Sequence, residues 1–228
     1  IQNGAKRLII IPLYPQFASA TVTTTIKECE RFLQKYHPEI PRKYFPEFYH
    51  YQSFIQSMAK MAKDYHTHTF DHVLMSFHGL PKRQIRKGDT TKNHCLKNKN
   101  CCDSITEINK HCYRDQAYQT ASLIAKELGL ESNLYSVSFQ SRLGKTKWIE
   151  PYTDNVLQEL PKRGIKKLAV ICPSFVTDCL ETLEEIGMRG KELFLQNGGE
   201  SFCLIPSLND SDVWVKGLGE MVRKFISQ

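Results

Sequence analysis

The sequence predicts an α/β fold with doubly wound, mostly parallel sheets and flanking helices. Two observations lead to this prediction. Apolar runs rich in β-forming residues alternate along the 228-residue chain with longer polar segments of helical periodicity. The apolar runs end at Gly, Pro or polar residues, which is typical of strands that turn toward a helix. A composition of 41% hydrophobic and 24% charged residues is that of an ordinary soluble globular protein.

The elements follow in order along the chain. The expected strands are the apolar runs 8–13, 72–77, 134–140, 168–172 and 202–205. The expected helices cover about 18–36, 51–65, 112–129, 153–162, 179–197 and 211–226. The polar, cysteine-bearing stretch 82–111 is too long for an ordinary βα loop, so we expect an insertion with a role of its own.

Four strand ends carry distinctive side chains in turn sequences. These are Tyr14-Pro15-Gln16, His78-Gly79, residues 139–142 (Phe-Gln-Ser-Arg) and Pro173-Ser174-Phe175. In open α/β sheets, ligands bind outside the carboxyl ends of the strands. The four turns are therefore expected to converge on one lined pocket.

His78 is the first candidate functional residue. It follows the apolar run 73–77, and Pro81 prevents a central strand from continuing beyond it. A neutral imidazole in that place can bind a metal or accept a proton near pH 7. The structural alternative is a histidine that only satisfies a turn.

An amphipathic helix with an acidic face is expected to begin at Asp178. Glu181 and Glu185 stand four residues apart and should project from one helix face. Such carboxylates can guide a hard cation or collect protons. The structural alternative is a capping box in which Asp178 and Glu181 only close the start of the helix.

The charge distribution and the ends of the chain set further limits. Of a net charge of +7, an excess of six lies between Lys82 and Arg114, where nine basic residues face three acids. No nucleic-acid-binding motif accompanies them, so a local anion, a membrane surface or a negatively charged metal cluster fits better. No apolar run approaches the ~20 residues of a membrane span. The chain starts at Ile1, without Met or a signal-peptide pattern, so we expect an upstream part to be absent.

Together these residues resemble the ferrochelatase family, which inserts Fe(II) into a porphyrin in haem synthesis. The matching segments are Tyr14-Pro15-Gln16, 76–81 (Ser-Phe-His-Gly-Leu-Pro), Gly88-Asp89, 139–144 (Phe-Gln-Ser-Arg-Leu-Gly) with Trp148 and Pro151, and 175–185 (Phe-Val-Thr-Asp-Cys-Leu-Glu-Thr-Leu-Glu-Glu). The resemblance covers the C-terminal two-thirds of such an enzyme and implies two Rossmann-like lobes. Residues 1–50 would complete the N-terminal lobe, 51–210 would form the C-terminal lobe with a cysteine-rich insertion at 90–112, and 211–228 would form a C-terminal helix.

The resemblance also implies site residues. His78 matches the essential histidine and Glu181 the carboxylate facing it, and both are implied to be catalytic and, with Glu185, to bind iron. Tyr14, Phe139, Ser141, Trp148 and Phe175 match positions that line the porphyrin pocket. The chain departs from many members at Arg189, where the acidic row would continue, and at Cys179, where a second histidine would stand.

The implied activity is insertion of Fe(II) into protoporphyrin IX with release of two protons. The alternatives are a coproporphyrin ferrochelatase, a cobalt chelatase for a related tetrapyrrole, and a non-catalytic haem- or metal-binding module. The expected partners are a porphyrin and ferrous iron, without nucleic acid. We expect a cytoplasmic protein, with peripheral contact to the inner membrane left open and the oligomeric state not predicted.

Four of the eight cysteines, namely Cys95, Cys101, Cys102 and Cys112, lie in the polar insertion. Four thiolates can form disulfides, a zinc site or an iron–sulfur site. The spacing lacks the C-x2-4-C knuckle usual for structural zinc, and the basic segment would offset the negative charge of a thiolate cluster. Some bacterial ferrochelatases carry an iron–sulfur cluster on such an insertion. The resemblance therefore favours a [2Fe–2S] cluster over zinc, with His94 and His111 as rival ligands.

Overall fold

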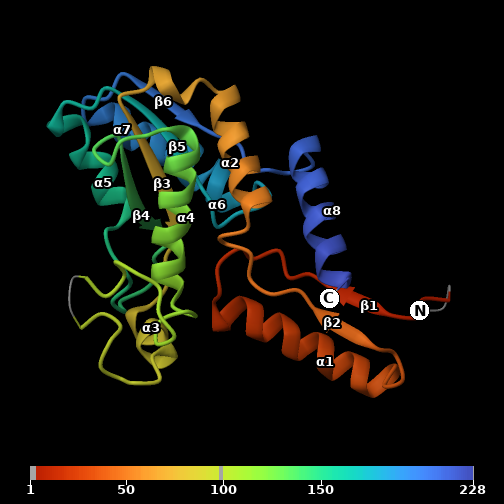
Figure 1. Cartoon of the computed structure of the whole chain (residues 1–228). Helices are drawn as coiled ribbons and strands as arrows, with labels where there is room; N and C mark the ends of the chain where they lie inside the picture. The colour runs from red at the N-terminus through yellow and green to blue at the C-terminus, as the bar shows by residue number, and fades with distance from the viewer. Residues whose placement is uncertain (1–3, 98–99, 228) are drawn as a thin grey trace.

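The computed structural model describes residues 4–97 and 100–227 and contains two parallel sheets (Figure 1). The smaller pairs β1 (Leu8–Ile10) with β2 (Arg42–Tyr44). The larger has the strand order β4-β3-β5-β6, and each neighbouring pair is parallel. Its strands are β3 (His72–His78), β4 (Tyr135–Gln140), β5 (Lys167–Ile171) and β6 (Ser201–Leu204). The predicted parallel α/β fold is confirmed.

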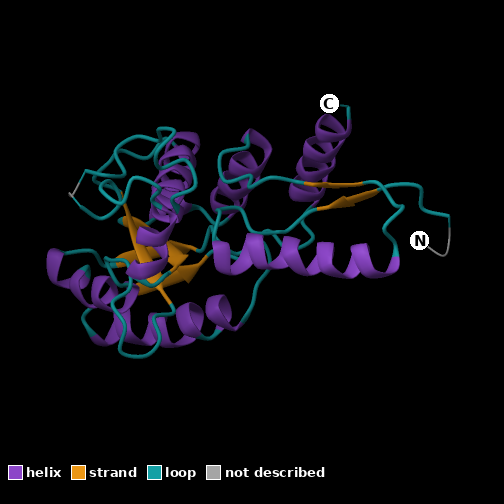
Figure 2. Cartoon of the chain, turned by 90° about the horizontal axis from the view of Figure 1, so that it is seen from below, coloured by secondary structure: helices purple, strands orange, loops and turns teal. Residues whose placement is uncertain are grey.

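Helices cover both faces of the larger sheet (Figures 1 and 2). Alternate residues of β3 point to opposite faces, so Met75 joins the core formed with α2 (Gln52–Asp64) and α4 (Tyr113–Leu128). Leu74 joins a second core on the other face, which includes residues of α5 (Thr153–Glu159) and α7 (Lys191–Gln196). The three layers leave the carboxyl ends of the strands to be shaped by loops.

The smaller sheet lies beside α1 (Thr24–Tyr36) and the C-terminal helix α8 (Asp212–Ile226) (Figure 2). Aromatic contacts tie this region together: the ring centroids of Phe45 and Phe225 are 5.0 Å apart, and those of Phe48 and Trp214 are 5.9 Å apart. The C-terminal helix therefore packs against the N-terminal part of the chain.

Several predicted elements differ in extent. The first strand ends at Ile10, close to Pro12, which has no N–H for a ladder. The helix expected at 18–36 begins with the π-helical turn η1 (Ser19–Thr23), and the one at 153–162 continues after α5 as η3 (Pro161–Arg163). The helix expected at 179–197 divides into α6 (Leu180–Leu183), the π-helical turn η4 (Glu185–Gly190) and α7.

Three elements were not predicted. Strand β2 contains two basic residues in three, and η2 (Thr67–Thr69) is a single short turn. The third is α3 (Lys82–Gly88), which occupies the start of the stretch read as one polar insertion. Three parts of the predictions lie outside the described residues. They are residues 1–3 at the start of the N-terminal lobe, residues 98–99 of the insertion (including Lys99 of the basic segment), and residue 228 at the end of the C-terminal helix.

Candidate active site at the strand ends

Three of the predicted turns meet at the carboxyl ends of β3, β4 and β5. The Gly79 amide donates to the Gln140 carbonyl over 2.8 Å, and the His78 amide donates to Ser174 Oγ over 2.9 Å. The fourth turn joins through Gln16, whose Nε2 lies 3.4 Å from the Pro173 carbonyl oxygen. The four turns therefore lie together at the carboxyl ends of the strands, as predicted, and their lining of one pocket stays a prediction.

His78 is held in one tautomer by its neighbour. Its Nδ1 lies 2.6 Å from the Gly79 carbonyl oxygen, and because a carbonyl can only accept, Nδ1 carries the proton. The neutral ring then has its lone pair on Nε2, which can bind a metal or accept a proton. The turn alternative for His78 accounts for Nδ1, and no side chain or backbone group of residues 4–97 and 100–227 is hydrogen-bonded to Nε2.

Aromatic rings flank His78. The ring centroids of Trp148 and Phe175 are 6.3 and 6.1 Å from that of the imidazole. Gly79 permits this approach because a Cβ there would lie 2.8 Å from the Gln140 oxygen and 3.2 Å from the Trp148 ring. His78 is therefore partly exposed and close to two large aromatic side chains.

Glu181 lies near His78 in the first turn of α6 and is half-buried. Hydrogen bonds from its own backbone N–H and the Cys179 side chain lower its pKa, against the effect of burial, and His78 lowers it further when the imidazole is protonated. The carboxylate is therefore ionised at neutral pH and within the electrostatic reach of the imidazole.

The capping alternative for Glu181 is wrong. The N-cap of α6 is Cys179 rather than Asp178, and the reciprocal partner in the box is Thr182, whose Oγ1 accepts from the Cys179 amide over 3.0 Å. Asp178 accepts from Thr182 Oγ1 at 3.1 Å, and also from Asn209 Nδ2 at 2.8 Å and the amide of Ser207 at 3.1 Å. Closing the helix start does not require the Glu181 carboxylate.

Glu185, four residues after Glu181, is hydrogen-bonded to Ser141. Its carboxylate accepts from the Ser141 amide at 2.7 Å and from Ser141 Oγ at 2.6 Å. Both residues line a cavity of about 260 Å³ that Arg189 and Phe139 also border. Glu185 thus fixes the Ser141 turn, where φ is +64°.

The remaining predicted pocket residues differ in exposure. Tyr14 is 39% exposed, whereas Phe139 is 1% exposed and packs against Phe77 and Tyr118. Phe139 therefore supports the site from within the core, and Tyr14 lies at the surface.

Gln140 helps to position the helix that carries Glu181, a role that the sequence did not indicate. Its Oε1 accepts from Ser76 Oγ at 2.8 Å, and its Nε2 donates to the Glu181 carbonyl at 2.7 Å. It joins the end of β4 to the helix that carries Glu181. Its place between Phe139 and Ser141 was the available signal.

The four insertion cysteines form one contiguous group. Cys101 Sγ and Cys102 Sγ are 3.8 Å apart, and Cys112 is hydrogen-bonded to both Cys95 and Cys102. Two thiolates bound tetrahedrally to one metal at about 2.3 Å would be separated by about 3.8 Å. Burial raises the pKa of Cys95 to about 11, so the Cys95 thiol needs a positive partner to ionise. None of the eight cysteines, all of which lie in the described residues, takes part in a disulfide.

Two side chains organise this loop from inside. Asp89 accepts from the amides of His94 and Cys95, each at 2.8 Å, and from the Thr91 hydroxyl at 2.7 Å. Asn109 donates to the Cys101 carbonyl at 3.3 Å and accepts from the Thr106 amide at 2.6 Å. The loop therefore has a defined scaffold around its thiols.

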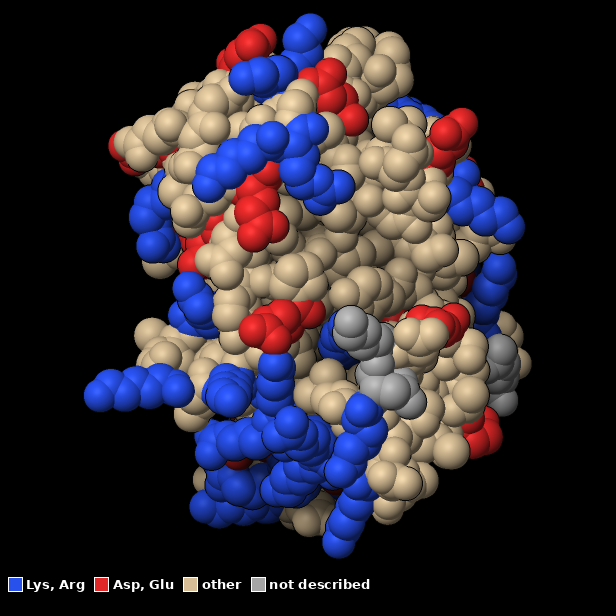
Figure 3. Space-filling view, turned by 90° about the vertical axis from the view of Figure 1, so that its left-hand side faces the viewer, with Lys and Arg blue, Asp and Glu red and all other residues tan. Residues whose placement is uncertain are grey.

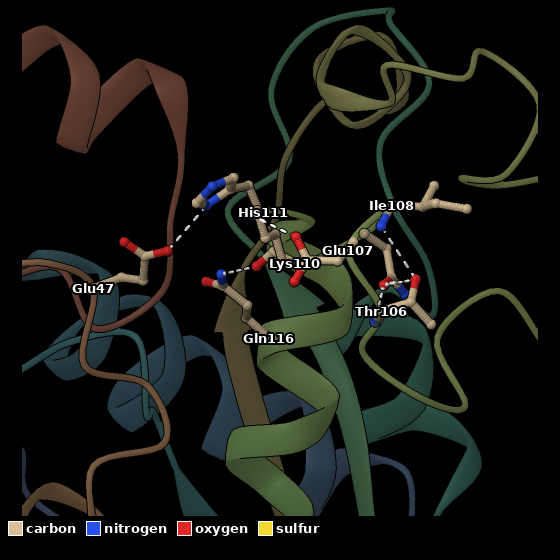
Figure 4. Close-up of polar contacts among 8 residues, drawn as sticks. Glu47, Thr106, Glu107, Ile108, Lys110, His111 and Gln116 are labelled. Carbon is tan, nitrogen blue, oxygen red and sulfur yellow. Dashed lines mark hydrogen bonds and ion pairs between the residues drawn. The ribbon is translucent and has the colours of Figure 1, made fainter.

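The rival histidine ligands are engaged elsewhere. His94 Nε2 lies 3.1 Å from the Cys101 carbonyl oxygen, so it donates there. His111 Nδ1 is 3.1 Å from the Glu47 carboxylate, toward the N-terminal part of the chain (Figure 4). Within residues 4–97 and 100–227, no group of three or more His, Cys, Asp or Glu side chains is arranged to hold a metal ion.

Lys and Arg side chains gather over the lower part of one face (Figure 3), the part where α3 and the cysteine loop lie in Figure 1. The exposed members include Arg83, Arg86, Lys87 and Lys92. In the described part of the chain, none of the helices has the length and apolar character needed to cross a bilayer.

Comparison with known proteins agrees with these features. A family profile described as ferrochelatase matches residues 1–226. The ferrochelatase of Pseudomonas fluorescens (strain Pf0-1) is 46% identical over 225 residues, which cover 98% of this chain and 66% of the relative. That of Pseudomonas aeruginosa (strain UCBPP-PA14) is 47% identical over 220 residues, or 96% of this chain and 65% of the relative. The chain thus spans slightly less than two thirds of the length of these relatives.

A solved structure shares the fold at low sequence identity. SirB from Bacillus subtilis with Fe3+ superposes with a TM-score of 0.64 and 12% identity, covering 98% of this chain and 73% of that one. The architecture therefore occurs on a very different sequence.

Proposed function

Because the chain belongs to the ferrochelatase family, we propose that the protein inserts Fe(II) into protoporphyrin IX to form haem. The observation that carries the proposal is His78 itself. Its free Nε2 lies at a strand end, between the rings of Trp148 and Phe175 and within reach of the charge of Glu181. A planar, apolar substrate that must lose protons and gain a cation suits this set of groups.

The proposed chemistry begins with the proton. Metallation releases two pyrrole protons, and His78 Nε2, whose lone pair is not used by the Nδ1–H bond to Gly79, is the group we assign to accept one of them. The Nδ1–H bond to the Gly79 carbonyl fixes the ring and stabilises the imidazolium that forms when Nε2 takes up a proton.

Glu181 would serve the metal or the second proton. Its lowered pKa keeps it ionised, so it can attract Fe(II) and hold it weakly while water leaves. A single carboxylate and a single imidazole form an open site that can release the metal to the ring nitrogens. We assign Glu185, which is bound to Ser141, to a supporting position in the same iron path.

The macrocycle would lie against the aromatic side chains. Trp148 and Phe175 provide ring faces close to His78. Tyr14 lies at the surface, and Ser141 lies in the turn after β4. Phe139 backs this wall from the core. Bending of the bound ring by these contacts would expose its nitrogens to the metal.

The cysteine group would hold a [2Fe–2S] cluster through Cys95, Cys101, Cys102 and Cys112. The observations that fit are the mutual contacts of the thiols, the engagement of both nearby histidines elsewhere, and Arg114 Nη1 at 3.1 Å from Cys102 Sγ. Bound there, a cluster supplies one-electron chemistry. Zinc is the competing occupant, and metal analysis distinguishes the two.

We also propose a cytoplasmic location in which the basic face touches the anionic inner membrane. The excess positive charge around α3 suits anionic headgroups, which attract exposed Lys and Arg side chains. Co-sedimentation with anionic vesicles that is lost at high salt would support this, and equal binding to neutral vesicles would contradict it.

The activity is tested by anaerobic metal insertion. Loss of protoporphyrin fluorescence is followed after addition of Fe(II) or Zn(II), using both the full-length protein and this chain alone. Protein-dependent loss that scales with enzyme concentration is the expected result for the full-length protein. Fluorescence that persists with bound porphyrin and added metal would identify a binding module instead.

A further inference from the structure

Tyr113 connects the cysteine group to the proposed base. It immediately follows Cys112 and is the first residue of α4. Its hydroxyl donates to the backbone carbonyl of His78 over 2.7 Å, across 35 residues of sequence. The side chain is 7% exposed, so this hydrogen bond is shielded from water.

The peptide groups around His78 are held at several points. Tyr113 binds the carbonyl, Ser174 Oγ accepts from the amide at 2.9 Å, and the Gly79 carbonyl fixes the ring through Nδ1. A displacement of the Tyr113 hydroxyl therefore changes the orientation of the peptide that carries the imidazole. Misplacement of a reacting group by about 1 Å can cost on the order of a hundredfold in rate.

The other end of the connection is equally constrained. Cys112 is the N-cap of α4, its amide donates to the Asn109 carbonyl at 2.7 Å, and its carbonyl accepts from the Gln116 amide at 3.0 Å. Its thiol contacts Cys95 and Cys102. A change at the thiols therefore acts on the first residue of a rigid helix.

We propose that Tyr113 is a positioning residue that transmits the state of the cysteine group to the orientation of His78. The proposal rests on the proposed function, because it assigns a role to a residue behind the proposed base. The insertion then has a role outside the metallation step, because the cysteine group influences the alignment of the His78 imidazole through Tyr113.

The first test is Tyr113→Phe in the full-length protein, with Tyr135→Phe as the matched control. Tyr135 starts β4 and pairs with Val73, at the amino ends of these strands, whereas His78 lies at the carboxyl end. We expect kcat for metallation to fall about tenfold in Tyr113→Phe. KM for porphyrin and metal, and the iron and sulfide content, should stay unchanged. The control should match the wild type in all four quantities.

The second test does not depend on activity. In protein labelled with 13C-histidine, the His78 imidazole resonance is assigned by its absence from His78→Ala and measured at fixed pH. Cys112→Ser should shift this resonance in the wild-type background. The same substitution should produce no further shift when Tyr113→Phe is already present.

Two outcomes would overturn the inference: wild-type kcat in Tyr113→Phe, or equal shifts caused by Cys112→Ser with and without the Tyr113 hydroxyl. Failure of the proposed function appears differently, as absence of metallation by the wild type. In that case the resonance experiment still decides the coupling. Loss of fold in Cys112→Ser would show in circular dichroism, and Tyr113→Phe alone would then decide.

Discussion

The two ends of β3 carry the same residue in different surroundings. His72 and His78 lie on the same face of one strand, six residues and about 20 Å apart. His72 is 5% exposed, its Nε2 is 2.8 Å from Ser136 Oγ, and burial, followed by the charge of Arg163, lowers its pKa to about 4. His78 is partly exposed, its Nδ1 is 2.6 Å from the Gly79 carbonyl oxygen, and it influences the pKa of Glu181 electrostatically.

Because the two residues are of the same type, their different burial follows from their positions along the strand. At the amino end other segments of the protein bury the His72 side chain, and this burial keeps its imidazole neutral near pH 7. At the carboxyl end the turns after β3, β4 and β5 come together around His78 and leave its side chain partly exposed. Variants at the two ends should therefore fail in different ways.

The largest effect is expected for His78→Ala. Metallation by the full-length protein should fall by at least ~10²-fold because the base is removed, while the melting temperature stays nearly unchanged. Steady-state insertion of Zn(II), followed by fluorescence, measures this. Retention of more than about a tenth of wild-type kcat, only ~1.4 kcal/mol of barrier, would rule out an essential base.

Glu181→Gln comes next and asks whether the acid beside His78 is part of the same chemistry. We expect a loss of about 10²-fold, since the amide can neither take a proton nor attract Fe(II) as a carboxylate does. Glu184→Gln is the matched control, because Glu184 pairs with Arg189 on the exposed side. Equal losses in both variants would show that helix charge, rather than Glu181, matters.

Cys112→Ser tests whether the insertion cysteines hold a [2Fe–2S] cluster. About two iron and two acid-labile sulfide per chain are expected for the wild type, and the variant should lose nearly all of both and its red-brown colour. Cys203→Ser, in β6, is the control and should keep them. One zinc and no sulfide in wild-type protein from iron-replete medium would replace the cluster with a zinc site.

The smallest effect on activity is expected for His72→Gln, whose consequence is pH-dependent stability. The pKa of His72 is lower in the folded state, so the unfolded chain binds the proton first and stability falls as the pH drops from about 6.5 to about 4. Removing this histidine should make the protein less acid-sensitive, by up to about 3 kcal/mol near pH 4. Urea unfolding at several pH values measures it, and unchanged acid sensitivity would contradict the assignment.

The sequence was sufficient where a local pattern determined the structure. The strands of the larger sheet lie within one or two residues of the apolar runs, and His78 was recognisable from the His-Gly turn that ends one of them. Strand β2 was not recognisable, because Arg42 and Lys43 form a strand only by pairing with β1.

Contacts between distant residues could not be predicted. The partner of Glu185 is Ser141, 44 residues away, and the partner of the His78 amide is Ser174, 96 residues away. The cap at Cys179 was missed for a chemical reason, since cysteine is not among the usual N-cap residues. Tyr113 reads in the sequence as an ordinary helix residue, and only packing places its hydroxyl on His78.

The most direct test of the account is to locate the porphyrin relative to the two histidines. Protoporphyrin IX is added to full-length protein labelled with 13C-histidine, with His78→Ala and His72→Gln used to assign the two resonances. Because the macrocycle has a strong ring current, the His78 resonance should move markedly and the His72 resonance should not. A porphyrin that binds by fluorescence but leaves His78 unmoved, or moves both alike, would contradict the placement of the active site at the carboxyl end of β3.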